Sequence, residues 1–155
     1  MLRKLKSVIL NIDDILAGIS VSLIVLITVI AVFARYVIGK PIQWTEEVSL
    51  GLFVWFIMLG ASSAMKINAN ISIDILVDLL PLRFRKYINI FVAVISFVTL
   101  SFIIVSGFLL AKQAGLKITP LLAVPYTYID IAIPVGGIMM LFHLIRRIKS
   151  EINKN

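Results

Sequence analysis

Residues 15–34 read ILAGISVSLIVLITVIAVFA, an uncharged and mostly aliphatic stretch of about 20 residues. As an α-helix, this stretch is about 30 Å long, which matches the hydrocarbon thickness of a bilayer. The basic start MLRKLK resembles that of a signal peptide. However, Asp13 and Asp14 intervene, the apolar part is too long, and no convincing small-residue cleavage site follows. We therefore interpret the stretch as a retained membrane span.

Three further apolar runs follow, at 48–65, 88–111 and 126–145, and each is about 18 to 24 residues long. The chain has 155 residues, of which 61% are hydrophobic and 15% charged, and its mean hydropathy is +1.08. A water-soluble domain of this size would not be so apolar. The sequence thus predicts an all-α integral membrane protein, with residues 1–155 forming a single domain of four transmembrane helices.

The 15 basic residues predict the orientation of these spans. If the N-terminus is cytoplasmic, eleven lie inside: Arg3, Lys4, Lys6, Lys66, Arg83, Arg85, Lys86, Arg146, Arg147, Lys149 and Lys154. Four lie outside, namely Arg35, Lys40, Lys112 and Lys117. The positive-inside rule therefore predicts that both termini are cytoplasmic. The net charge of +7 then has a topogenic explanation, and no soluble basic domain is present to suggest a nucleic-acid partner.

The first outer connection reads RYVIGKPIQWTEEV from Arg35 to Val48. Trp44 is typical of headgroup depth, and Thr45 is a plausible N-cap for the second span. Glu46 and Glu47 would then lie in its first turn, where the helix dipole favours carboxylates. We weigh a charged helix start, with Arg35 or Lys40 as counter-ions, against partner contacts. A catalytic carboxylate pair is disfavoured because adjacent helical residues point about 100° apart.

The apolar runs themselves contain few ionisable residues. The first three have none, and the fourth has only Asp130 near its outer end and His143 near its inner end. A transporter that couples ions by itself usually has such groups at depth, so this chain has no evident coupling site. We favour an interfacial polar role for His143 over haem ligation, because it is the only histidine. The chain also lacks cysteine, and we expect no cofactor or metal site.

Small residues indicate close helix packing in lipid. They occur as the segment GASSA at 60–64, as Gly107 and Ala111 four residues apart, and in the fourth span. Packing within the four-helix unit and docking onto another protein explain them equally well. In the fourth span, Pro134 with Gly136 and Gly137 predicts a helix break, because proline cannot donate to the carbonyl of Asp130 and its ring crowds that group.

The segment between spans two and three, NISIDILVDLLP, is amphipathic at helical spacing. Acidic and amide side chains gather on one face and aliphatic ones on the other, so we predict an interfacial helix at about 70–80. Its two faces include Ile73, Asp74, Leu76, Asp78 and Leu80. Packing over the protein's own cytoplasmic face is the alternative. We expect an inner basic anchor near anionic headgroups, formed by Arg83, Arg85, Lys86, Arg146 and Arg147.

Three motifs in this order carry a family resemblance. They are RYVIGKPIQWTEEV, then LGASSAMKINANISIDILVDLLP, then VPYTYIDIAIPVGGIMMLFHL. Over nearly the whole chain, the pattern resembles the small membrane subunit of tripartite ATP-independent periplasmic (TRAP) transporters, the DctQ-type family. One departure is Asn70, which stands where such proteins often have histidine, so no role of that histidine is carried over.

The resemblance implies a non-catalytic subunit of the bacterial inner membrane. Its partners would be a large multi-span membrane subunit that holds the substrate and sodium sites, a periplasmic substrate-binding protein, and the lipid bilayer. The transported compound would be an organic acid such as a C4-dicarboxylate or sialic acid. This subunit would scaffold the large one and help dock the binding protein. Arg35, Tyr36, Trp44, Glu46 and Glu47 are our predicted outer-interface and partner contacts.

Two other classes of function remain as alternatives. An autonomous small four-span transporter would need a carboxylate deep in its first span, and residues 15–34 contain none. A membrane anchor subunit of a respiratory complex that carried haem would need axial ligands, which would give a Soret band.

Overall fold

The computed structural model describes residues 11–66 and 82–152, and these ranges are helical apart from short connections. Four helices in them are long and apolar enough to cross a membrane: Ile12–Ile38, Trp44–Lys66, Tyr87–Leu116 and Thr127–Lys149. This confirms the prediction of four spans. All four are longer than the apolar runs suggested, because polar residues continue a helix where it enters the headgroup region.

The first span consists of α2 (Ile12–Phe33) and a π-helical turn, η1 (Ala34–Ile38). Gly39 ends it in the left-handed conformation, with φ of 71°, and the backbone N–H of Lys40 donates to the carbonyl of Ala34 at 3.1 Å. A residue without a Cβ adopts this conformation at low cost, which explains why the chain turns at a glycine.

The second span is α3 (Trp44–Lys66). It begins at Trp44, so Thr45 lies inside the helix, and the prediction of Thr45 as N-cap was wrong. The Thr45 hydroxyl instead donates to the carbonyl of Ile42 at 2.6 Å, which ties the first turn to the preceding connection. Glu46 and Glu47 lie in the first turn of α3, as predicted.

The third span belongs to α5 (Leu82–Gln113), a helix of 32 residues that continues into η2 (Ala114–Leu116). Arg83, Arg85 and Lys86 therefore belong to the start of a long helix. The predicted interfacial helix at 70–80, with Ile73, Asp74, Leu76, Asp78 and Leu80, lies outside the described residues.

The fourth span consists of the short α6 (Thr127–Asp130) and α7 (Ala132–Ile152). The helix is interrupted at Ile131, three residues before Pro134. The interruption lies in the turn between Asp130 and Pro134, where the prediction placed it, and Pro134, Gly136 and Gly137 lie within α7. Proline is well tolerated in the first turn of a helix, where backbone N–H groups have no intrahelical acceptor.

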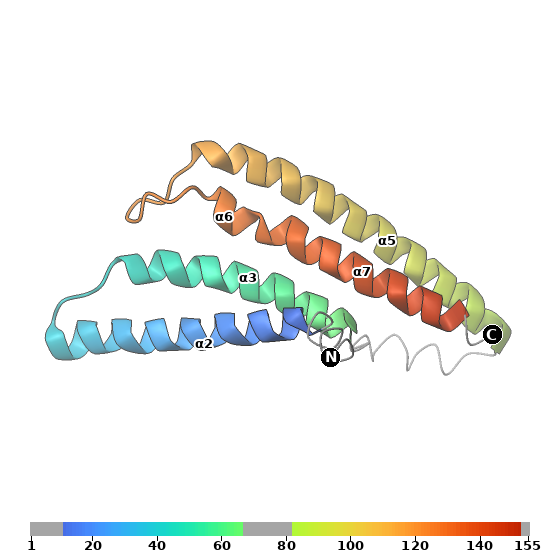
Figure 1. Ribbon diagram of the computed structural model, residues 1–155, viewed down its shortest axis with the longest axis horizontal. Helices are drawn as coiled ribbons and strands as arrows, with labels where there is room; N and C mark the ends of the chain where they lie inside the picture. The colour runs from blue at the N-terminus through green and yellow to red at the C-terminus, as the bar shows by residue number, and fades with distance from the viewer. Residues whose placement is uncertain (1–10, 67–81, 153–155) are drawn as a thin grey trace, which may run out of the picture.

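The helices form a single row in the order α2, α3, α7, α5 (Figure 1). α3 packs against α2 on one side and α7 on the other, and α5 packs against α7. The start of α2 and the end of α7 lie toward the same end of the row, which we call the terminal end (Figure 1). The connections at 39–43 and 117–126 lie at the opposite end, which we call the loop end.

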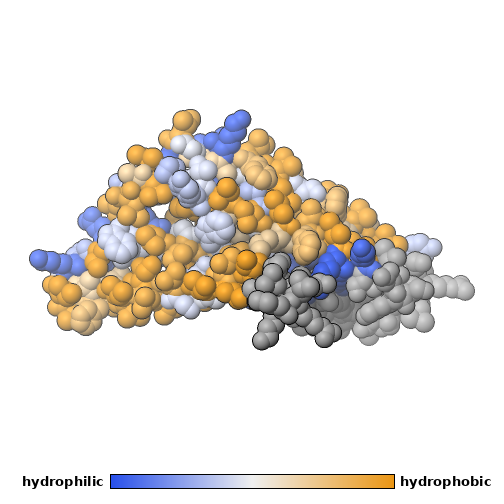
Figure 2. Space-filling view, viewed as in Figure 1, coloured by the Kyte–Doolittle hydropathy of each residue, from blue (hydrophilic) through white to orange (hydrophobic). Residues whose placement is uncertain are grey.

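This row leaves most apolar side chains on its surface. In an apolar stretch of 18 residues from each span, only 11%, 11% and 6% are buried in the first three spans, against 33% in the fourth. The fourth span contains α7, whose Gly136 and Gly137 allow close approach to α3 and α5. Figure 2 shows hydrophobic residues covering most of the visible helical surface, with hydrophilic ones mainly near the ends. Such a surface requires lipid or other protein around it.

Glycines set the spacing on both sides of α7. A Cβ at Gly136 would lie 2.7 Å from Cβ of Met58 on α3, and one at Gly137 would lie 2.8 Å from Cγ1 of Ile104 on α5. Across the same α5–α7 contact, a Cβ at Gly107 would lie 2.9 Å from Cδ of Pro134. These three glycines therefore serve packing within the chain, which is one of the two predicted explanations for the small residues.

Candidate functional site

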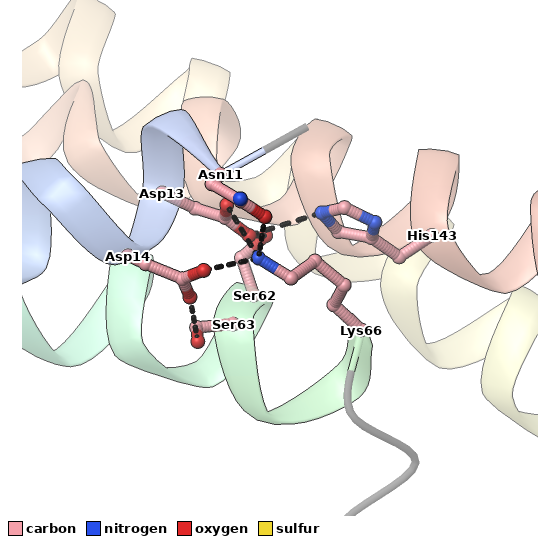
Figure 3. Close-up of polar contacts among 7 residues, drawn as sticks. All are labelled: Asn11, Asp13, Asp14, Ser62, Ser63, Lys66 and His143. Carbon is pink, nitrogen blue, oxygen red and sulfur yellow. Dashed lines mark hydrogen bonds and ion pairs between the residues drawn. The ribbon is translucent and has the colours of Figure 1, made fainter. Parts of the chain in front are cut away.

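A polar cluster joins three helices at the terminal end (Figure 3). α2 contributes Asp13 and Asp14, α3 contributes Ser62, Ser63 and Lys66, α7 contributes His143, and Asn11 precedes α2. Its members are brought together because the start of α2, the end of α3 and the second half of α7 lie side by side in the row. We call these seven residues the terminal-end cluster.

Asp13 is the centre of the cluster and is only 1% exposed. Its Oδ2 accepts a hydrogen bond from the Ser62 hydroxyl at 3.3 Å and lies 3.0 Å from Nε2 of His143. Its Oδ1 lies 3.6 Å from Nζ of Lys66 and has no hydrogen-bond partner. A carboxylate this deeply buried is costly unless it is paired. Residues of α3 and α7 therefore compensate the negative charge that α2 supplies.

Lys66 also contacts several residues of the terminal-end cluster. Its ammonium group forms an ion pair with Asp14 and donates to Oδ1 of Asn11 at 2.9 Å. The Ser63 hydroxyl also donates to Asp14. Among the described residues, no group of three His, Cys, Asp or Glu side chains could hold a metal ion. The geometry of the cluster suits cross-linking of helix ends.

Glu47 fixes a connection at the loop end. Its carboxylate accepts hydrogen bonds from the backbone N–H groups of Leu121 at 2.8 Å and Leu122 at 3.0 Å. Within the same connection, the N–H of Val124 donates to Oγ1 of Thr119 at 3.1 Å. Charge-assisted bonds of this kind are stronger than neutral ones. Glu47 therefore holds the connection between α5 and α6 against the start of α3.

A groove of about 620 Å³ opens at the loop end between α2 and the start of α3. Arg35, Tyr36 and Glu46 lie at it and are exposed. Within residues 11–66 and 82–152, neither Arg35 nor Glu46 makes an ion pair or a side-chain hydrogen bond. Trp44, which is 45% exposed, lies beside the groove lining at the start of α3.

The predicted outer-interface residues therefore differ in what they do. Glu47 is used inside the chain, whereas Arg35, Tyr36, Trp44 and Glu46 face outward at the loop end. The proposed ion pairs of the two glutamates with Arg35 or Lys40 do not form in the described part of the chain. Of the predicted inner basic anchor, Arg146 is exposed and Arg147 half-buried on α7.

Sequence reasoning missed the terminal-end cluster. It treated Asp13 and Asp14 as residues before the first span, Lys66 as a loop charge, and His143 as an isolated interfacial residue. The signal was available: with an N-terminus and a C-terminus on one side, the start of span one, the end of span two and the end of span four must share that side. Acidic residues at the first of these positions, with a lysine at the second and a histidine at the third, indicate a cross-link between the helix ends.

Comparison with known proteins identifies the type of chain. The family model described as "Tripartite ATP-independent periplasmic transporters, DctQ component" matches residues 24–154. The sialic acid TRAP transporter small permease protein SiaQ of Vibrio cholerae is 24% identical over 147 residues, covering 95% of this chain and 85% of SiaQ.

Two longer relatives match over part of their length. The sialic acid TRAP transporter permease protein SiaT of Haemophilus influenzae is 33% identical over 120 residues, covering 77% of this chain and 20% of SiaT. The isethionate TRAP transporter permease protein DctMQ of Oleidesulfovibrio alaskensis is 30% identical over 112 residues, covering 70% of this chain and 18% of DctMQ. This chain belongs to the DctQ family, the non-catalytic small permease components of TRAP transporters.

Proposed function

We propose that this small permease subunit is the scaffold of a three-part uptake system in the bacterial inner membrane. It holds a large multi-span subunit, which carries the substrate and sodium sites, and it helps a periplasmic binding protein to dock. The transported compound is an organic acid. The large subunit, the binding protein, the orientation and the substrate class are all parts of this proposal.

The row of helices is the observation that carries the proposal. It has two broad apolar faces and little interior, so it offers a large area for packing against a membrane partner. In the described parts of the four spans, the ionisable side chains lie near the helix ends. A translocation path for an organic anion requires polar groups at depth, so this geometry favours a supporting role.

The long relatives support association with a large permease subunit. Sequence similar to this chain makes up about a fifth of SiaT and of DctMQ. A region joined covalently to a larger permease has a high effective concentration for contact with it. Relatives named for sialic acid and for C4-dicarboxylates support an organic acid as the substrate.

The charges support the orientation and the docking role. The start of α2 and the end of α7 point toward the terminal end, and the positive-inside rule favours a cytoplasmic position for that end. The loop end would then face the periplasm, where Arg35, Lys40 and Glu46 are exposed. Exposed charges of both signs suit recognition of a soluble binding protein, whose approach they would steer.

Co-purification tests the proposal. The tagged chain is expressed with its genomic neighbours, extracted in mild detergent and purified. We expect a much larger multi-span protein in stoichiometric amount, identified by mass spectrometry. A stable homo-oligomer of this chain alone, under conditions that preserve membrane complexes, would contradict the scaffold role and favour an autonomous transporter.

A further inference from the structure

The loop-end groove is lined by exposed polar residues, which we call its rim, and by apolar residues. Arg35, Gln43 and Glu46 supply charged and amide groups, while Ala31 and Val32 supply an apolar wall. The remaining lining residues are Thr28, Tyr36, Pro41, Ile42, Thr45, Ser49 and Leu121. An opening of about 620 Å³ is within the range of ligand sites.

The two charges on the rim are opposite in sign and do not satisfy each other. Arg35 and Glu46 both line the groove, yet no ion pair joins them within the described ranges. A guanidinium group fits a phosphate through bidentate hydrogen bonds, and a carboxylate fits an ammonium group. A ligand that carries both charges would complement this rim.

A second, apolar groove of about 340 Å³ adjoins the first along the outer part of α2. The two share Thr28, Val32 and Tyr36, and the second adds Val29, Phe33 and Val37. Its exposed lining is aliphatic and aromatic, and α2 is an edge helix of the row. A hydrocarbon chain could therefore leave the polar rim beside Tyr36 and lie along α2.

We propose that the two grooves together bind one zwitterionic phospholipid with a primary ammonium headgroup. Arg35 binds the phosphate, Glu46 binds the ammonium group, and an acyl chain packs against Val29, Val32 and Phe33. A phosphatidylethanolamine satisfies both charges, whereas an anionic phosphatidylglycerol satisfies only Arg35. This site does not depend on the proposed scaffold role, since it needs only a bilayer and this chain. While a lipid occupies it, Arg35 and Glu46 are not available for the docking contacts proposed above.

Native mass spectrometry of the purified full chain, delipidated in detergent, tests the preference. Phosphatidylethanolamine, phosphatidylglycerol and phosphatidylcholine are titrated separately. We expect the first to bind most tightly, and R35Q to weaken it about tenfold, as loss of one charge-assisted contact does. We expect E46Q to abolish the preference over phosphatidylglycerol. The control K40Q changes a neighbouring cation outside the groove lining and should bind as the wild type does.

Equal binding of all three lipids by the wild type would overturn the proposal, as would equal losses in R35Q and K40Q. A photo-cross-linking residue at Gln43 then distinguishes the occupants in the assembled transporter. We expect a covalent lipid adduct. A cross-link to another protein without a lipid adduct would show that a partner segment occupies the groove, and would also overturn the proposal.

Discussion

The two ends of the helix row use charge in opposite ways. At the terminal end, Asp13 is 1% exposed and is compensated by groups on two other helices. At the loop end, Arg35 and Glu46 are exposed and have no ion-pair partner in the described part of the chain. Charge therefore cross-links helices at the terminal end. At the loop end, Glu47 holds a connection, whereas Arg35 and Glu46 remain available for external recognition.

The largest expected effect comes from removing one side of the terminal-end cluster. K66M would leave Asp13 buried without a nearby cation, and breaking such pairs typically costs about 3–5 kcal/mol. We expect the low end of that range because Lys66 is 19% exposed. Unfolding in a detergent titration measures the free-energy change. K40M, at the exposed loop end, should change it little, and equal losses in both variants would remove the contrast between the ends.

Packing between the ends should show the next largest effect. G136A would place a Cβ 2.7 Å from Cβ of Met58, and overpacking of this kind costs about 1–3 kcal/mol. G60A is the matched control on α3, since a Cβ there meets no atom within 4 Å. We expect G60A to match or slightly exceed wild-type stability. A tolerated G136A would show that α3 and α7 are not packed this closely.

Glu46 and Glu47 allow a comparison within the loop end between an exposed carboxylate and one that is hydrogen-bonded inside the chain. E47Q should weaken the hydrogen bonds to the Leu121 and Leu122 amides and speed their hydrogen exchange, because a neutral amide is a weaker acceptor than a carboxylate. E46Q should leave that exchange unchanged. Exchange is measured in detergent by mass spectrometry. If E46Q and E47Q accelerated the exchange of these amides equally, the hydrogen bonds of Glu47 would not be what stabilises this connection.

Single-cysteine substitutions should have the smallest effect on the structure, and they test which end of the row faces the periplasm. The chain has no cysteine, so single-cysteine variants label cleanly. An impermeant maleimide should label K40C in intact spheroplasts and should label K149C only after the membrane is permeabilised. Both positions are exposed, so a difference reports sidedness. The reverse pattern would invert the proposed orientation.

Sequence reasoning captured the four spans because long apolar runs have few other stable arrangements in a membrane. It underestimated their length at Asp13 and at Lys66, where charged residues continue the helices. It could not distinguish Glu46 from Glu47, since only the position of the connection around Leu121 gives the second one its partners. The arrangement of the helices in a single row could not be predicted from the sequence either, because periodicity describes each helix without its neighbours.

Reconstitution of transport tests the central claim of a non-catalytic scaffold most directly. Proteoliposomes are made with this chain alone, with this chain, the co-purified large subunit and the periplasmic binding protein, and with the last two without this chain. Uptake of a labelled organic acid is measured under a sodium gradient. We predict uptake only with the full set, and a marked loss when this chain is omitted. Uptake by this chain alone would contradict the scaffold role.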